Sequence, residues 1–138
     1  EFFDRKVNVV LTPKKRCFSE YSTIAVAMKV QQAGFESWKL HFMELVDEFR
    51  RTLDARLILL PPPKDLEARL TALLASIVRT LCFEAKMDTP EWAARRYFLE
   101  SPWFVSGIEA LKASALLESP MAFRTNNIFV QDNFLSRA

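Results

Sequence analysis

The sequence of 138 residues contains very little glycine, histidine and cysteine: two glycines, one histidine and two cysteines. Two glycines are few for a β-sandwich or a barrel, because the tight turns of such folds need this residue. They are also too few for a phosphate-binding glycine loop. One histidine and two widely separated cysteines exclude zinc fingers, iron–sulfur clusters and multi-histidine metal sites. We therefore expect a helical chain with no metal and no other cofactor.

The sequence also lacks a strong charge excess and long apolar runs. Nineteen basic and seventeen acidic residues give a net charge of +2, which is small for a dedicated nucleic-acid domain unless the charge is segregated. No apolar run is long enough to cross a membrane, and no secretory signal pattern opens the chain. Cys17 and Cys82 belong to no motif, and isolated reduced thiols are the default in the cytoplasm. These features predict a cytoplasmic protein with no membrane segment.

Apolar residues repeat at helical spacing over most of the chain, and half of all residues are hydrophobic. This period predicts three longer helices, at residues 19–32, 36–53 and 65–86. The leucine-rich stripe of the third is wide enough to form the centre of a core. A hydroxyl residue followed by proline is a good helix start. Such pairs predict three shorter helices, at residues 90–96, 102–117 and 120–125.

Two short β-prone stretches lie near the ends of the chain, at residues 7–11 and 128–130. A single strand is not stable by itself, so we expect residues 128–130 to pair with 7–10, within one subunit or between two. The predicted fold is all-α, a multi-helix orthogonal or bundle-like single domain with at most a minor two-stranded pairing of the termini. Residues 1–18 are expected to be an N-terminal extended arm, and residues 19–138 the helical domain.

Aromatic residues are numerous, with twelve phenylalanines and three tryptophans. A helical domain of this size is small for hiding all of them, and exposed aromatic patches usually mark binding surfaces. Aromatics mixed with arginines near the predicted helix 90–96 are typical of protein interfaces. The candidate interface residues are Trp92, Arg95, Arg96, Tyr97, Phe98 and Trp103. Two alternatives stay open for this cluster: core aromatics with arginines at the rim, and nucleic-acid binding by base stacking and phosphate contact.

Side chains suited to acid–base or nucleophilic chemistry are scarce. His41 is the only histidine, and no serine or cysteine is spaced to act as its nucleophile. Glu44 and Glu48 share one face of the predicted helix 36–53, but the partner histidine and second helix of a carboxylate-bridged metal site are missing. We therefore expect no enzymatic activity. A pocket joining these three residues is the remaining possibility for a catalytic or ligand site.

Three motifs stand out in the C-terminal part of the chain. They are Ser101-Pro102-Trp103-Phe104-Val105-Ser106-Gly107, Leu116-Leu117-Glu118-Ser119-Pro120-Met121-Ala122-Phe123-Arg124 and Asn127-Ile128-Phe129-Val130. With these motifs, residues 36–138 resemble the C-terminal part of a loosely defined group of uncharacterised bacterial helical proteins. The resemblance implies a bacterial protein. Members of the group sometimes carry or accompany helix-turn-helix regulators of antitoxin type. It supplies no catalytic residue. The group's ending is often richer in arginine than Arg124-Thr125-Asn126.

Three functional hypotheses follow. The favoured one is a non-enzymatic interaction or regulatory module of a bacterial cytoplasm that associates with itself, for example as a homodimer, or with another protein. The second is a nucleic-acid-associated regulator. In that case the phosphate contacts would come from the basic residues Lys14, Lys15 and Arg16, together with Arg124; for the front triplet, a solvated loop is the simpler interpretation. The third hypothesis is a small-ligand binder or enzyme with a pocket between helices.

Overall fold

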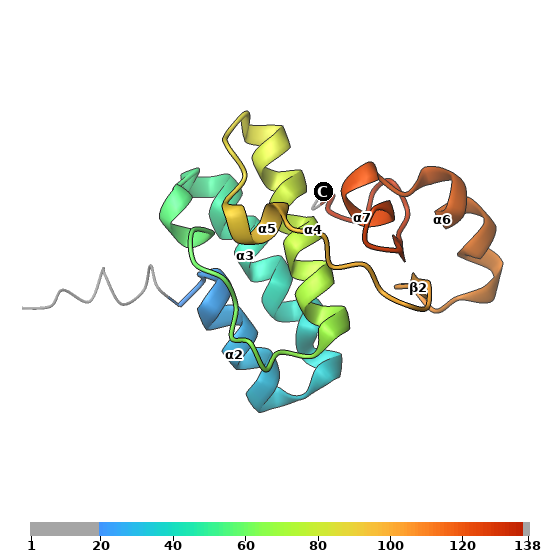
Figure 1. Cartoon of the computed structure of the whole chain (residues 1–138), viewed down its shortest axis with the longest axis horizontal. Helices are drawn as coiled ribbons and strands as arrows, with labels where there is room; N and C mark the ends of the chain where they lie inside the picture. The colour runs from blue at the N-terminus through green and yellow to red at the C-terminus, as the bar shows by residue number, and fades with distance from the viewer. Residues whose placement is uncertain (1–19, 137–138) are drawn as a thin grey trace, which may run out of the picture.

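The computed structural model describes residues 20–136, in which helices dominate. The helices are α2 (Thr23–Ala33), α3 (Trp38–Thr52), α4 (Ala68–Ala85), α5 (Glu91–Ala94), α6 (Lys112–Glu118) and α7 (Met121–Arg124). Short 3-10 helices lie at Phe35–Ser37, Ala55–Leu57 and Glu109–Leu111. Figure 1 shows α2, α3 and α4 packed together as a helical body, with α6 and α7 on one side of it. The predicted mostly helical fold class is confirmed for these residues.

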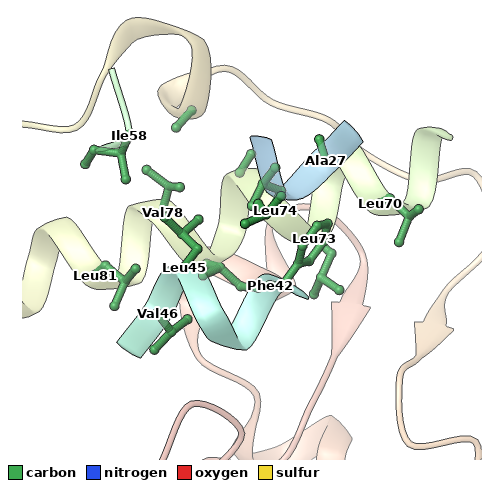
Figure 2. Close-up of a cluster of buried hydrophobic side chains, with 14 of the residues drawn as sticks. Ala27, Phe42, Leu45, Val46, Ile58, Leu70, Leu73, Leu74, Val78 and Leu81 are labelled. Carbon is green, nitrogen blue, oxygen red and sulfur yellow. The ribbon is translucent and has the colours of Figure 1, made fainter. Parts of the chain in front are cut away.

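Helix α4 forms the centre of the core, as its leucine-rich stripe predicts. Figure 2 shows Leu73, Leu74 and Val78 of α4 clustered with Phe42 and Leu45 of α3, and all five side chains are fully buried. Burying each such side chain contributes roughly 1.5–3 kcal/mol relative to leaving it in water. The helical body is therefore held mainly by the apolar stripe of α4 and the faces that α2 and α3 turn toward it.

Helix α2 starts and stops at residues suited to these positions. The Ser22 side chain accepts a hydrogen bond from the backbone N–H of Ala25 at 3.2 Å, so Ser22 is the N-cap. At the other end the N–H of Gly34, whose φ is +107°, donates to the carbonyl of Val30. The observed helix begins four residues after the start of the predicted range 19–32 and ends one residue after its end.

The predicted helix over residues 102–117 is wrong in its first half. Residues Trp103–Phe104 form the strand β2, and the chain then turns at Gly107, whose φ is +69°. Glycine adopts this left-handed conformation without the penalty that a side chain would bring. Regular α-helix begins only at Lys112.

Long-range contacts of Trp103 account for this difference. Its ring lies 6.1 Å from that of Phe35 and 6.2 Å from that of Trp38, centroid to centroid. Both partners lie more than 60 positions earlier in the chain, so a local period cannot reveal them. Helix propensity is a weak preference that tertiary contacts of large aromatic side chains override.

Strand β3 (Ile128–Phe129) confirms the predicted β-prone stretch near the C-terminus. It pairs in parallel with β2, with Trp103 opposite Ile128 and Phe104 opposite Phe129. The rings of Phe104 and Phe129 are stacked, with centroids 5.2 Å apart. The described partner of β3 is thus β2, and the predicted partner at residues 7–10 lies outside the described residues.

The hydroxyl–proline pairs mark two short helices, but their hydroxyls do not cap them. Helices α5 and α7 lie inside the predicted ranges 90–96 and 120–125, each with proline at the N-cap and no side-chain cap. The buried Oγ of Ser119 instead donates to the carbonyl of Ile128 at 3.1 Å and accepts from the N–H of Val130 at 3.3 Å. Ser119 therefore joins the end of α6 to the segment around β3.

Candidate protein-interaction surface

The prediction that Trp92 is an exposed interface residue is wrong. Its side chain is only 5% exposed, and its indole N–H donates to the backbone carbonyl of Ile58 at 2.9 Å. A buried indole N–H needs such a partner. Trp92 therefore fastens α5 to the chain between α3 and α4 and is a core residue.

Tyr97 and Trp103 are half-buried, and both side chains contact other residues of the fold. The Tyr97 hydroxyl donates to the carbonyl of Trp92, and partial burial raises the pKa of this hydroxyl above its usual value. The indole of Trp103 lies under the guanidinium of Arg69, whose central carbon is 5.6 Å from the ring centroid. Neither side chain leaves a large free surface for a partner.

Only three of the six candidate interface residues are exposed. Arg95 and Arg96 lie on the surface, and Phe98 is 54% exposed. The guanidinium of Arg96 lies over the ring of Phe98, 5.1 Å from its centroid. A cation that covers the ring in this way reduces the apolar surface that Phe98 offers. These residues form a small mixed patch rather than the predicted aromatic interface.

An internal cluster accounts for much of the aromatic excess. Helix α3, strand β2 and the C-terminal residues contribute rings to it, with neighbouring centroids about 6 Å apart. Its members are Phe35, Trp38, Phe42, Trp103, Phe123 and Phe134. The cluster lies where the helical body meets the C-terminal segment. Aromatic abundance by itself therefore does not indicate an exposed binding surface here.

Sequence reasoning missed an exposed apolar feature, which we name the α4–α7 groove. It is a cavity of about 490 Å³ whose lining includes Arg79, Phe83, Met87, Thr89, Pro120 and Met121. Phe83 is 86% exposed at its edge and Met121 is 69% exposed. Large apolar side chains gathered around a groove are typical of binding surfaces.

A local signal for Phe83 is present in the sequence. Along an ideal helix, Phe83 lies about 200° around the axis from Leu81, the last leucine of the buried stripe. The helical period thus places a phenylalanine on the polar side of α4, next to Glu84. The second wall of the groove has no such signal, because α7 approaches α4 only through the tertiary fold.

The candidate phosphate-binding residues receive little support. Lys14, Lys15 and Arg16 lie outside the described residues. The Arg124 guanidinium donates to the backbone carbonyls of Ser119 at 3.0 Å and Leu117 at 3.3 Å. Residues 20–136 carry thirteen basic and fifteen acidic side chains. This part of the chain therefore has a small negative charge.

The three titratable candidates contact neighbouring side chains. His41 Nδ1 lies 3.1 Å from Glu44 Oε1, and Glu48 pairs with Arg51 at 2.6 Å. Neither the α4–α7 groove nor a second cavity, of about 500 Å³ beside Trp38, is lined by any of the three. No three His, Cys, Asp or Glu side chains come together to hold a metal ion within residues 20–136.

The thiol of Cys82 is buried, as its place on the apolar stripe predicts. Burial raises the pKa of this thiol, and the nearby Asp88 acts in the same direction. A thiol whose pKa is raised is a weak nucleophile near neutral pH, because little thiolate is present. Cys82 is therefore a packing residue of α4, whereas Cys17 lies outside the described residues.

Comparison of the chain with protein-family models, with curated proteins and with solved structures found no match. The resemblance of residues 36–138 to a group of bacterial helical proteins therefore stays a prediction. None of the helices between residues 20 and 136 combines the length and the apolar composition needed to cross a bilayer. Functional reasoning for this protein thus depends on the geometry of its surface.

Proposed function

We propose that this protein is a non-enzymatic protein-interaction module of the bacterial cytoplasm, and that the α4–α7 groove is its binding surface. The observation that carries the proposal is the exposure of Phe83, which stands almost entirely in water at the edge of an apolar cavity. Full burial of a phenylalanine side chain contributes roughly 1.5–3 kcal/mol. A partner that covers Phe83 and Met121 gains this free energy without rearranging the core.

The two walls of the groove are anchored to the core, which favours a preformed binding site. Next to Phe83 in α4, Leu81 and Cys82 are fully buried, and Phe123 of α7 packs against the ring of Phe134. Groove residues held in this way lose little conformational freedom on binding, so more of the contact energy appears as affinity. Neither Arg96 nor Phe98 of the mixed patch lines this groove.

Site-specific photo-crosslinking in living bacterial cells tests the proposal. A photoreactive phenylalanine analogue is placed at position 83 of the full chain and, as a matched control, at position 98. Both positions are exposed phenylalanines, so both substitutions leave the core intact. We expect discrete adducts from position 83 that survive nuclease and disappear with protease, and far weaker ones from position 98.

Two results would contradict the proposal. Equal or absent protein adducts at both positions would remove the groove as a binding surface. Adducts that nuclease destroys would instead favour the nucleic-acid hypothesis, in which Lys14, Lys15 and Arg16 contact phosphate groups.

A further inference from the structure

We propose that the occupant of the α4–α7 groove is the same groove of a second copy of this chain, in a two-fold dimer whose α4 helices run antiparallel and cross at Phe83. This inference rests on the proposed function and names the partner. Three features of the groove carry it: a ridge beside a cavity, charges of opposite sign without ion-pair partners at its two ends, and the placement of these charges before Phe83 in α4 and after the end of α4.

The groove offers both halves of a self-complementary contact. Arg79 and Phe83 lie four residues apart, so they follow one another along a single face of α4, and Met87 lies just after the end of this helix at Ala85. The Phe83 ring forms a ridge, and the cavity beside it lies within the range of about 300–1,000 Å³ that holds small organic groups. A two-fold axis lets each ridge enter the partner's cavity, so one contact satisfies both copies.

The charges at the two ends of the groove are also complementary. Arg79 lines one end, and its guanidinium donates to Thr125 Oγ1 at 3.2 Å. Asp88 is exposed at the other end, between the lining residues Met87 and Thr89. Within residues 20–136 neither Arg79 nor Asp88 has an ion-pair partner. An arginine and an aspartate without ion-pair partners on one surface leave two charges for an interface to pair.

The placement of these charges agrees with the symmetry. Arg79 precedes Phe83 by four residues, about 6 Å along α4, whereas Asp88 follows the end of α4 at Ala85. A two-fold axis at Phe83 sets the two α4 helices antiparallel and therefore brings Arg79 of each copy toward the loop that carries the partner's Asp88. Lys86 is exposed near the same end and opposes this attraction. We accordingly expect Lys86→Ala to tighten the dimer severalfold.

Sedimentation-velocity centrifugation of the full chain over a concentration series tests the dimer. We expect the 16.0 kDa chain to convert, with rising concentration, to a species of twice that mass. A dissociation constant of about 1–100 μM is expected, since the groove is small for a permanent dimer. Phe83→Glu should raise this constant at least about 30-fold. The matched control Phe98→Glu should leave it within about twofold, and circular dichroism verifies that both variants are folded.

A charge exchange tests the orientation of the two copies. Arg79→Asp and Asp88→Arg should each weaken the dimer about 10-fold, because each sets like charges against each other twice. The double variant Arg79→Asp/Asp88→Arg should recover to within about threefold of the wild type, since it restores opposite charges across the axis. A double variant as weak as the single ones would overturn the antiparallel arrangement.

The remaining outcomes separate this inference from the proposed function. A dimer that Phe83→Glu leaves intact would place the interface elsewhere and overturn the inference. A chain that is monomeric at every concentration, but that crosslinks to another protein from position 83, would overturn the dimer and leave the interaction module standing. A monomer with no protein adduct at position 83 would overturn both.

Discussion

The helical body, residues 20–94, and the C-terminal segment, residues 95–136, share one apolar core but differ in how far they depend on single polar side chains. The body buries a continuous apolar cluster along α4 (Figure 2). The C-terminal segment adds Phe123, Ile128 and Val130 to this cluster but has only short elements, and the side chains of Asn126, Asn127 and Ser119 bind backbone groups at Tyr97, Leu99 and Ile128. Apolar burial is spread over many side chains and has no direction, whereas these hydrogen bonds depend on single groups in defined positions.

Asn126 is the clearest case of this dependence. The residue is fully buried, and its Oδ1 accepts from the backbone N–H of Tyr97 at 2.9 Å. Its Nδ2 donates to Ser76 Oγ of α4, also at 2.9 Å. One amide therefore joins two parts of the C-terminal segment to the central helix. We therefore expect the body to tolerate polar changes at its surface, and the C-terminal segment to loosen when one buried polar group is removed.

The largest expected effect is in the apolar body. Leu73→Ala removes a fully buried side chain from the middle of α4 and should lower the free energy of unfolding by about 2–5 kcal/mol, because it leaves a cavity. Urea unfolding followed by circular dichroism measures this. The control Leu40→Ala, at a position 63% exposed, should change it by less than about 0.5 kcal/mol. Equal losses for the two variants would contradict the claim that buried apolar side chains along α4 stabilise the helical body.

The next effect tests the C-terminal segment. Asn126→Ala leaves the N–H of Tyr97 without its acceptor and should cost about 1–3 kcal/mol. Amide hydrogen exchange should show faster exchange confined to residues 95–136, with α4 still protected. Asn133→Ala, at an exposed position, is the control. Equally faster exchange in the helical body would contradict the claim that Asn126 stabilises the C-terminal segment in particular.

A smaller loss is expected where one hydroxyl holds two backbone groups. Ser119→Ala removes the bonds to the carbonyl of Ile128 and from the N–H of Val130 and should cost about 0.5–2 kcal/mol in unfolding free energy. The control Ser101→Ala, at an exposed serine, should stay within about 0.5 kcal/mol of the wild type. Thermal unfolding that does not distinguish the two serines would contradict the structural role of Ser119.

The smallest effect is a pH dependence at the boundary of the two regions. Burial raises the pKa of Tyr97 above the value of about 10 that it has in the unfolded chain. The neutral hydroxyl therefore stabilises the fold fully below pH 10, and this contribution is lost as the pH rises through the folded pKa. Tyr97→Phe should show a shallower loss of stability above pH 10 than the wild type. Cys82, whose pKa is also raised, is common to both proteins and cancels in the difference. Parallel pH curves would contradict the prediction.

Much of the helical body was predictable from the sequence. The predicted ranges 36–53 and 65–86 differ by at most three residues at either end from α3 (Trp38–Thr52) and α4 (Ala68–Ala85). In an amphipathic helix every third or fourth residue is apolar and faces the core, so the local sequence pattern is enough to predict the helix. The range 102–117 failed because Trp103 is placed by rings from a distant part of the chain.

The candidate site was predicted less well. Of the six interface candidates, Trp92 is buried, and Tyr97 and Trp103 are half-buried, since aromatic–arginine composition does not say which side of a ring faces the core. The exposure of Phe83 could be predicted from the helical period, because Phe83 lies off the leucine stripe of α4. Its partner wall at Met121 was not, because the approach of α7 to α4 involves residues more than 30 positions apart.

The fold class, the long helices and the central place of α4 follow from the sequence alone, because repeating apolar residues encode a buried helical face locally. The tertiary structure alone settles where Trp103 packs, which strand pairs with β3 and how deeply Trp92 is buried. These depend on contacts between distant segments, and their free energy exceeds the local preferences that a sequence pattern displays. The α4–α7 groove belongs to this second class: α4 supplies one wall from its own period, and the fold of the C-terminal segment supplies the other.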